Sequence, residues 1–267
     1  MSTSTPQTAV PAGPGATAPR RRRGRVFAAV LCGLLGAGAT GAAAYGVVSE
    51  HRAAHRLLAA DAAYRKAASL WRTTPVDTLF PPVLAGPGAG PGGADRSWTR
   101  IALAPDADCP AALPADWRTL LSPAGCTRVL RATYTDATRS SLVTVGMVFA
   151  PAGSDTAALR DLRGRLPAPP GYGFDDDRRA AWTATVLPEA PVVVYAVSAF
   201  NDGRTLDAPR PAEELMRKDA AGPAARAGLG HETRAVADRV ERAVRALAAP
   251  PAAPPTPPAA AAPEPAR

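Results

Sequence analysis

VVVYAV, residues 192–197, is apolar at every position. A strand with one face in water alternates between apolar and polar residues, whereas a strand covered on both faces is apolar throughout. We therefore interpret this segment, extended to Ala199, as a central and covered strand of a β-sheet. A preceding strand is expected over 182–187, and the turn sequence NDG at 201–203 ends the pair.

Two further strands are expected to form an antiparallel hairpin. Residues 127–135 and 142–149 both alternate, and the second places Val143, Val145, Met147 and Phe149 on one face. A polar turn over 136–139 joins them.

Helices are expected around this sheet, together with a first strand over 97–103. The last helix, 232–247, carries its apolar residues at the three- and four-residue spacing of a buried stripe. The other expected helices cover 114–121, a segment from Ser154 or Asp155 through Leu166, and 211–218. The order β-α-β-β-α-β-β-α predicts an α+β domain of two layers, an antiparallel sheet with helices mainly on one face.

The boundaries of this domain follow from composition. AGPGAGPGGA, residues 85–94, indicates a flexible linker, which we extend to 73–94. The folded domain is therefore expected over 95–249. The remaining segment, 250–267, is almost entirely Pro and Ala and is expected to be a disordered tail.

An uncharged run of 23 residues at 26–48 is long enough to cross a bilayer as a helix. Five arginines precede it, namely Arg20, Arg21, Arg22, Arg23 and Arg25. Positive charge on one flank favours the cytoplasm for that side, so the N-terminus is expected inside and the main domain outside. Residues 1–25 are then a disordered basic cytoplasmic tail, and 49–72 form a juxtamembrane helix.

Alternatives for this run remain open. Ala42 and Ala44 resemble a signal-peptidase site, although the run is longer than an ordinary signal-peptide core. Cys32 does not fit lipid attachment, because Leu31 precedes it where a small residue is required. Gly33, Ala37 and Gly41 form a small-residue face that could associate two helices, or that a Gly/Ala-rich segment produces by chance.

Charge does not indicate a nucleic-acid partner. The net charge is +8, but the first 48 residues contribute five arginines and no acids, which leaves +3 for the rest. The positive-inside rule accounts for that excess, and neither a phosphate-binding Gly-rich loop nor a basic-aromatic pattern occurs.

The cysteines predict one disulfide. Cys109 and Cys126 both lie in the segment placed outside the cytoplasm, where disulfides persist, and Cys32 remains unpaired. Two free buried cysteines are the alternative.

Candidate catalytic and metal-binding residues are few. His51 and His55 share a helix face, but structural zinc has four ligands, so two interfacial polar residues are the preferred interpretation. Asp175, Asp176 and Asp177 lack the spacing of a calcium loop and are expected to close against neighbouring arginines. His231, the single histidine of the domain, is expected to cap a helix. We therefore expect no catalytic residues, no metal and no cofactor.

The composition is rich in Arg, Ala and Pro, and Lys66 and Lys218 are its two lysines. With the arginine-flanked membrane segment, the Gly/Pro linker and the segment CTRVLRATYTDATRSSLVTVGMVFAP, the chain resembles actinobacterial, streptomycete-type single-pass membrane-anchored proteins. This resemblance covers roughly 26–249 and implies no catalytic residue.

The functional expectation is a membrane-anchored, extracytoplasmic binding or assembly module of the cell envelope rather than an enzyme. Its expected partners are the bilayer, through 26–48, and an envelope protein or cell-wall component, with self-association through the membrane helix as a further option. The alternative is an envelope hydrolase or wall-modifying enzyme whose site the sequence does not disclose.

Overall fold

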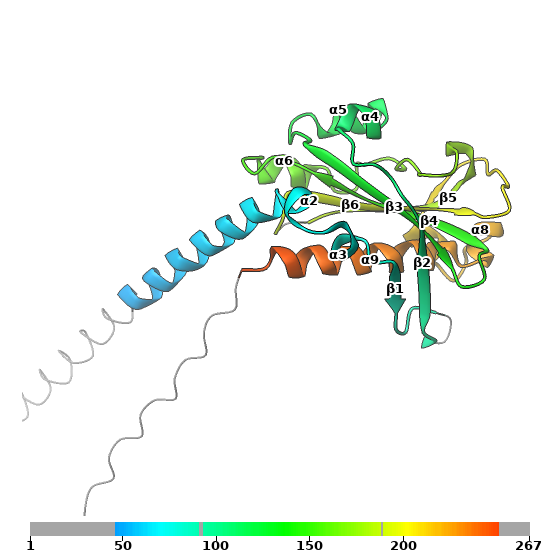
Figure 1. The fold of residues 1–267 in the computed structure, drawn as a ribbon, viewed down its shortest axis with the longest axis horizontal. Coiled ribbons are helices and arrows are strands. Elements are labelled where there is room, and N and C mark those ends of the chain that lie inside the picture. Colours follow the sequence, from blue (N-terminus) through cyan, green and yellow to red (C-terminus); the bar gives the residue numbers. More distant parts are fainter. Residues whose placement is uncertain (1–45, 91–92, 188, 251–267) are drawn as a thin grey trace, which may run out of the picture. The chain divides into compact units, whose positions relative to one another are not determined.

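The computed structural model describes residues 46–90, 93–187 and 189–250 (Figure 1). The chain divides into two compact units, Met1–Arg56 and Leu57–Arg267. The described part of the first unit is helical, and this helix continues to residue 67. Several predictions lie outside the described residues: the tails at 1–25 and 251–267, the five arginines, Cys32, and the face formed by Gly33, Ala37 and Gly41.

No helix within the described ranges has both the length and the apolar character that crossing a bilayer requires. Of the expected membrane segment, the described ranges include residues 46–48. The membrane segment therefore stays a prediction.

Seven strands form one mixed sheet in the described part of the second unit. They are β1 (Val83–Gly86), β2 (Arg96–Leu103), β3 (Arg128–Asp136), β4 (Ser141–Phe149), β5 (Arg179–Val186), β6 (Val192–Phe200) and β7 (Arg210–Pro211). Their order is β1-β2-β3-β4-β6-β5-β7, and β7 runs parallel to β5 while the other neighbours are antiparallel. The α+β class is confirmed, and β2 to β6 correspond to the five strands expected from the sequence.

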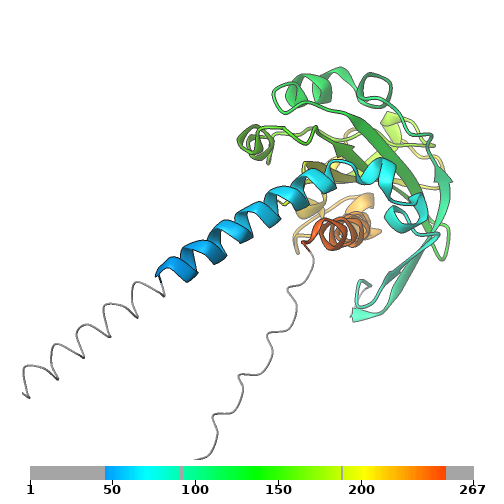
Figure 2. The same ribbon diagram turned by 60° about the vertical axis from the view of Figure 1, so that its left-hand side comes forward.

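The prediction of two layers is wrong, because helices also cover the second face of the sheet. Helix α9 (Leu229–Ala248) lies on one face, and α4 (Cys109–Ala112), α5 (Ala115–Leu121) and α6 (Thr156–Asp161) lie on the other. Figure 2 shows α9 in red and the green α4–α5 segment on opposite sides of the strands. Strands β4 and β6 are buried at every position. A strand that is apolar on both faces requires a layer on each side, which the two-layer prediction did not supply.

The second layer includes one close contact between aromatic side chains and the sheet. Tyr195 of β6 lies across Gly146 of β4, where an added Cβ would come within 2.2 Å of the phenol ring. Trp117 of α5 meets the same ring edge-on, with the ring centroids 5.4 Å apart, and both side chains are fully buried. Glycine at position 146 therefore makes room for the aromatic pair that joins α5 to the sheet.

The domain begins earlier than expected, at the end of the predicted juxtamembrane helix, and it includes the segment predicted to be a linker. Helices α2 (Leu70–Thr73) and α3 (Val76–Leu79) place Leu70, Leu79 and Phe80 in the core beneath α9, and β1 pairs with β2. Gly86 lies so close to the Trp98 ring that an added Cβ would come within 2.5 Å of it. The Gly/Pro-rich sequence therefore forms an edge strand and its turn rather than a free connection.

The C-terminal part contains three helices where two were expected. Short helices α7 (Ala212–Leu215) and α8 (Pro223–Arg226) precede α9, and a 3-10 turn, η2 (Asp176–Arg178), precedes β5. Helix α9 starts three residues before the expected Glu232, because Gly228, at φ 74°, takes a left-handed conformation that ends α8 and begins α9. The stripe predicted for this helix consists of Val236, Val240, Val244 and Leu247; the three valines are buried, and Leu247 is partly buried against the core.

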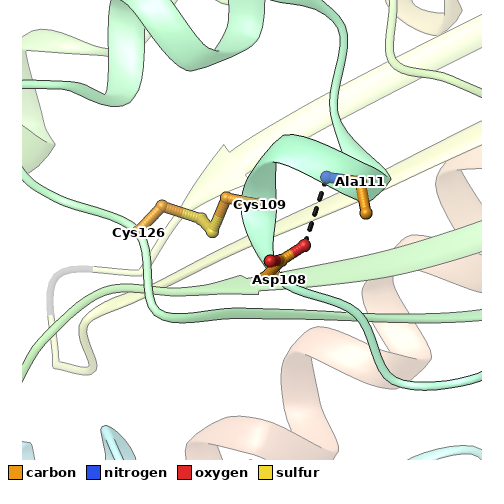
Figure 3. The surroundings of a disulfide bond; sticks show 4 residues. All are labelled: Asp108, Cys109, Ala111 and Cys126. Atoms are coloured by element: carbon orange, nitrogen blue, oxygen red, sulfur yellow. Dashed lines mark hydrogen bonds between the residues drawn. A yellow bond between two sulfur atoms is a disulfide. The ribbon is translucent and has the colours of Figure 1, made fainter.

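The predicted pairing of Cys109 with Cys126 is confirmed. The two cysteines form a disulfide with their Cα atoms 6.2 Å apart, joining α4 to the segment that leads into β3 (Figure 3). The carboxylate of Asp108 accepts a hydrogen bond from the Ala111 N–H at 3.2 Å and caps α4. The crosslink thus encloses α4 and also α5, the helix that carries Trp117.

Replacing both Cys109 and Cys126 by Ala should lower the free energy of unfolding. The cysteines lie 17 residues apart, and the chain entropy released by opening a loop of this size corresponds to about 3 kcal/mol. Urea unfolding with and without reductant measures the loss, and reduced wild-type protein should show the same shift. Cys32→Ala is the matched control and should change nothing. Alkylation of both cysteines in unreduced, folded protein would contradict the pairing.

Candidate functional site

A polar pocket of about 390 Å³ opens at one end of the sheet, on the side of α9. Three segments form it: the β3–β4 turn, the end of β6 with the following turn, and the N-terminal end of α9. Its lining consists of Arg139, Ser140, Ser141, Phe200, Asn201, Asp202, Arg204, Ala227, Leu229 and Glu232.

Asp136 builds the first wall, the β3–β4 turn. Its Oδ1 accepts hydrogen bonds from the backbone N–H groups of Ser140, at 2.7 Å, and Ser141, at 2.9 Å, and Thr138 donates to Oδ2. Burial opposes ionisation, but these hydrogen bonds outweigh it and lower the pKa of Asp136 to about 2. The carboxylate is therefore ionised at neutral pH and committed to the turn.

Arg139 occupies an unusual backbone conformation in this turn. Its φ of 55° makes it the one non-glycine residue with a positive φ among the described residues. Its N–H donates to the Asp136 carbonyl at 3.0 Å, and Asn201 Nδ2 donates to the Arg139 carbonyl at 2.8 Å. These contacts hold a conformation that costs an L-residue about 1–2 kcal/mol. Within the described ranges, the Arg139 guanidinium has no ion pair.

The second wall carries an ion pair at the surface. Arg204 binds the carboxylate of Asp202 through Nε, at 3.0 and 2.8 Å from its two oxygens, and its guanidinium lies over the Phe200 ring with 4.3 Å to the centroid. The hydrogen bonds from Arg204 hold the pKa of Asp202 below its usual range. This wall therefore presents a neutralised pair together with a cation–aromatic contact.

The floor of the pocket is a buried charge cluster that joins three elements. Glu232, in the first turn of α9, is buried and forms an ion pair with Arg96 of β2. Its Oε2 accepts a hydrogen bond from Ser141 Oγ at 2.5 Å, and Ser141 is itself buried. The same hydroxyl lies 3.3 Å from Asp136 Oδ1. The cluster thus fixes the start of α9 against β2 and the hairpin.

The lining of the pocket carries two arginines, Arg139 and Arg204, and two carboxylates, Asp202 and Glu232. Both carboxylates are engaged by an arginine, whereas Arg139 has no carboxylate partner in the described part of the chain. Helix α9 begins at the pocket without a side-chain cap. Its N-terminal N–H groups add positive potential at the same place.

The residues singled out from the sequence lie elsewhere. Asp175, Asp176 and Asp177 are exposed, and Asp176 pairs with Arg179 at 3.4 Å, so the expected closure against neighbouring arginines is seen for Asp176. His231 is exposed at the start of α9. Across the described ranges, no group of three or more His, Cys, Asp or Glu side chains could hold a metal ion.

Sequence reasoning did not identify the pocket residues. Arg139 was assigned only to a polar turn, and Glu232 only to a helix start. A signal for the turn was present, because an Asp followed by Thr and Ser at two and four residues can satisfy the backbone of a tight turn. No local signal connects Ser141 with Glu232, which lie 91 positions apart.

No protein-family model, curated protein or solved structure matches this chain.

The charge cluster predicts a thermodynamic coupling between Arg96 and Glu232. Arg96→Met leaves Glu232 buried without its cation and should lower the free energy of unfolding by about 2–3 kcal/mol, less than for a fully buried pair because Arg96 is partly exposed. Adding Glu232→Gln should recover about 1–2 kcal/mol of that loss. A double-mutant cycle by urea unfolding measures this coupling.

Arg217→Met is the matched control for this cycle. It removes an arginine from an exposed pair with Asp219 and should change stability by less than about 1 kcal/mol. Additive effects of the Arg96 and Glu232 substitutions would show that the two charges do not interact.

Proposed function

We propose that this protein is a membrane-anchored, extracytoplasmic binding module of the cell envelope, and that its pocket takes an anionic group of the partner. The Cys109–Cys126 disulfide supports the compartment, because disulfides persist outside the reducing cytoplasm. The five arginines before residues 26–48 support an anchor with the N-terminus inside. The face of Gly33, Ala37 and Gly41 would let two such anchors associate.

We infer the class of ligand, an anion, from the backbone conformation and the surroundings of Arg139. Strained backbone conformations persist at binding sites where the surrounding structure enforces them. Glycine would adopt this turn without strain, yet the chain has arginine there, with its guanidinium lining a pocket and unpaired among the described residues. A guanidinium in this setting recognises carboxylate or phosphate oxygens.

Binding fits the pocket better than catalysis does. General acid–base chemistry needs a group that can exchange a proton with a bound substrate. Asp136 is held ionised by its hydrogen bonds, and Glu232 is engaged by Arg96 and Ser141. The Ser141 hydroxyl points at a carboxylate, which is the arrangement of a hydrolytic nucleophile, but Ser141 is only 2% exposed. Ser141 is therefore the one residue that favours the enzyme alternative, and its burial keeps a substrate from reaching it.

Arg139→Gly should separate binding from stability. It should remove anion binding while leaving the free energy of unfolding unchanged or raising it by up to about 1 kcal/mol, because glycine relieves the left-handed strain. The full chain in detergent is titrated with inorganic phosphate, glycerol phosphate and acetate, and amide chemical shifts are followed by NMR. In the wild type we expect shifts at Ser140, Ser141 and Leu229.

Arg163→Gly provides the control, because Arg163 is exposed and lies outside the pocket lining. It should keep the wild-type titration. The anion-binding proposal is wrong if none of the three anions shifts these amides in the wild type, or if Arg139→Gly responds as the wild type does.

Reporter fusions test the membrane topology. Alkaline phosphatase fused after Arg72 should be active, because the enzyme needs an oxidising compartment and residue 72 follows the proposed anchor. A fluorescent reporter that matures only in the cytoplasm should be dark at the same position. Replacing the five arginines by Asn should weaken this asymmetry. The reverse pattern in the unmodified fusions would contradict the orientation.

A further inference from the structure

His51 and His55 bring two imidazole nitrogens together on an exposed helix. Their Nε2 atoms are 2.9 Å apart, and the rings stand nearly perpendicular at 81°, with centroids 4.3 Å apart. Both residues are exposed, as is every residue from 47 to 62 of this helix. One imidazole donates this hydrogen bond through its Nε2–H and the other accepts it, so the two nitrogens lie together at the helix surface, and a bound metal ion would replace the shared proton.

The separation of the nitrogens fits two ligands of one transition-metal ion. Zinc lies about 2.0–2.1 Å from an imidazole nitrogen. An ion at that distance from both Nε2 atoms, which are 2.9 Å apart, subtends an N–Zn–N angle of about 90°. Opening the pair to about 3.3 Å gives the tetrahedral angle that zinc prefers, a change within the rotamer freedom of exposed side chains.

One chain supplies only half of a closed zinc site. Structural zinc is four-coordinate, and among the described residues no third His, Cys, Asp or Glu joins this pair. The two missing ligands have the same chemistry as the two present. A second copy of the chain, with its own His51 and His55, would complete a set of four imidazoles.

The helix carries a seam on which a second copy could pack. Val48, His51, His55 and Leu58 follow the alternating three- and four-residue spacing of coiled-coil core positions. Val48 and Leu58 are 45% and 66% exposed, so the apolar members of this seam are uncovered. In a parallel pair of such helices, equivalent core positions face each other. The His51–His55 pair of one chain would then lie at the same height along the helix axis as the His51–His55 pair of the other.

Charges beside the seam do not oppose a parallel pair. In a parallel pair, a residue that flanks the seam on one helix faces the flanking residue whose number is higher by five on the partner helix. The facing residues would be Val47 with Arg52, Ala54 with Ala59, and Asp61 with Lys66. No like charges meet at these flanking positions, and one pair is of opposite sign. Beyond Leu58 the next core positions are Ala62 and Arg65, so the seam ends before Arg65.

We propose that His51 and His55 of two copies of this chain bind a single zinc ion, which joins the two helices in parallel. The site is separate from the polar pocket and does not depend on what that pocket binds. It makes association of the two chains responsive to zinc in the surrounding medium.

The test uses the full chain in detergent, freed of metal and purified with an affinity tag that contains no histidine. Zinc titration should saturate at one ion for two chains. Analytical ultracentrifugation should show zinc-dependent dimers that EDTA dissociates. Cobalt substitution should give the intense visible absorption of a tetrahedral ion. If the membrane segments already hold the chains as dimers, ultracentrifugation will not depend on zinc. The zinc stoichiometry and the cobalt spectrum then test whether the four-histidine site forms.

Variants of the pair supply the controls. His51→Ala and His55→Ala should each abolish the cobalt spectrum and the zinc-dependent dimer, without unfolding a helix in which alanine is favourable. The double change His55→Arg with Arg56→His keeps the composition, but it turns the second imidazole about 140° away at five-residue spacing and should also fail.

His231→Ala removes the exposed histidine of the domain and should leave zinc binding unchanged. One ion for each chain with a weak, octahedral cobalt spectrum would overturn the proposal. So would an absence of binding in the wild type, or binding that survives His51→Ala.

Discussion

Strands β4 and β6 lie side by side in the sheet and bury both of their faces along their whole length. Successive side chains of each strand point to opposite faces of the sheet. Because they are apolar on both faces, each face must be covered to keep them out of water. Helix α9 does this on one face, with Val236, Val240 and Val244. On the other face the chain builds a second layer from the short helices α4, α5 and α6, and the disulfide closes the segment that contains α4 and α5. The remaining strands extend this twice-covered pair outward.

The polar pocket is a consequence of the same layering. Where α9 begins, the apolar stripe gives way to Glu232 and Thr233, both buried. Each must therefore find a polar partner. Glu232 finds Arg96 and Ser141, and Thr233 finds the hydroxyl of Ser198 at 2.9 Å. The buried polar side chains at this end of the sheet thus have hydrogen-bond or ion-pair partners. Arg139 lies beside them. Among the charged residues that line the pocket in the described part of the chain, Arg139 is without an ion pair, which is why the proposed binding is assigned to it.

Much of the sheet could be predicted from the sequence, because period-two patterns and a continuous apolar run are local properties. The disulfide also followed from two residues and their compartment. Strand β1 could not be found, since its residues stand among glycines and prolines and pair only because β2 offers them an edge. The second helical layer depends on the contact of Tyr195 with Gly146, which no periodicity records. The pocket joins residues far apart in the sequence. The spacing of His51 and His55 suggested a shared face, but only the side-chain rotamers bring their nitrogens together.

The contacts of α9 have a further consequence for how the domain is assembled in time. Through Glu232 the helix reaches Arg96, 136 residues earlier, and the Arg239 side chain donates to the carbonyl of Pro87, 152 residues earlier. Contacts of such long range must wait for loop closure and slow the folding of a chain. Until α9 arrives, one face of β4 and β6 stays open to water, with β-rich apolar segments exposed to other chains. A nascent domain of this design is therefore most prone to aggregate in the interval between the synthesis of β6 and that of its last helix, and a holding chaperone would act in that interval.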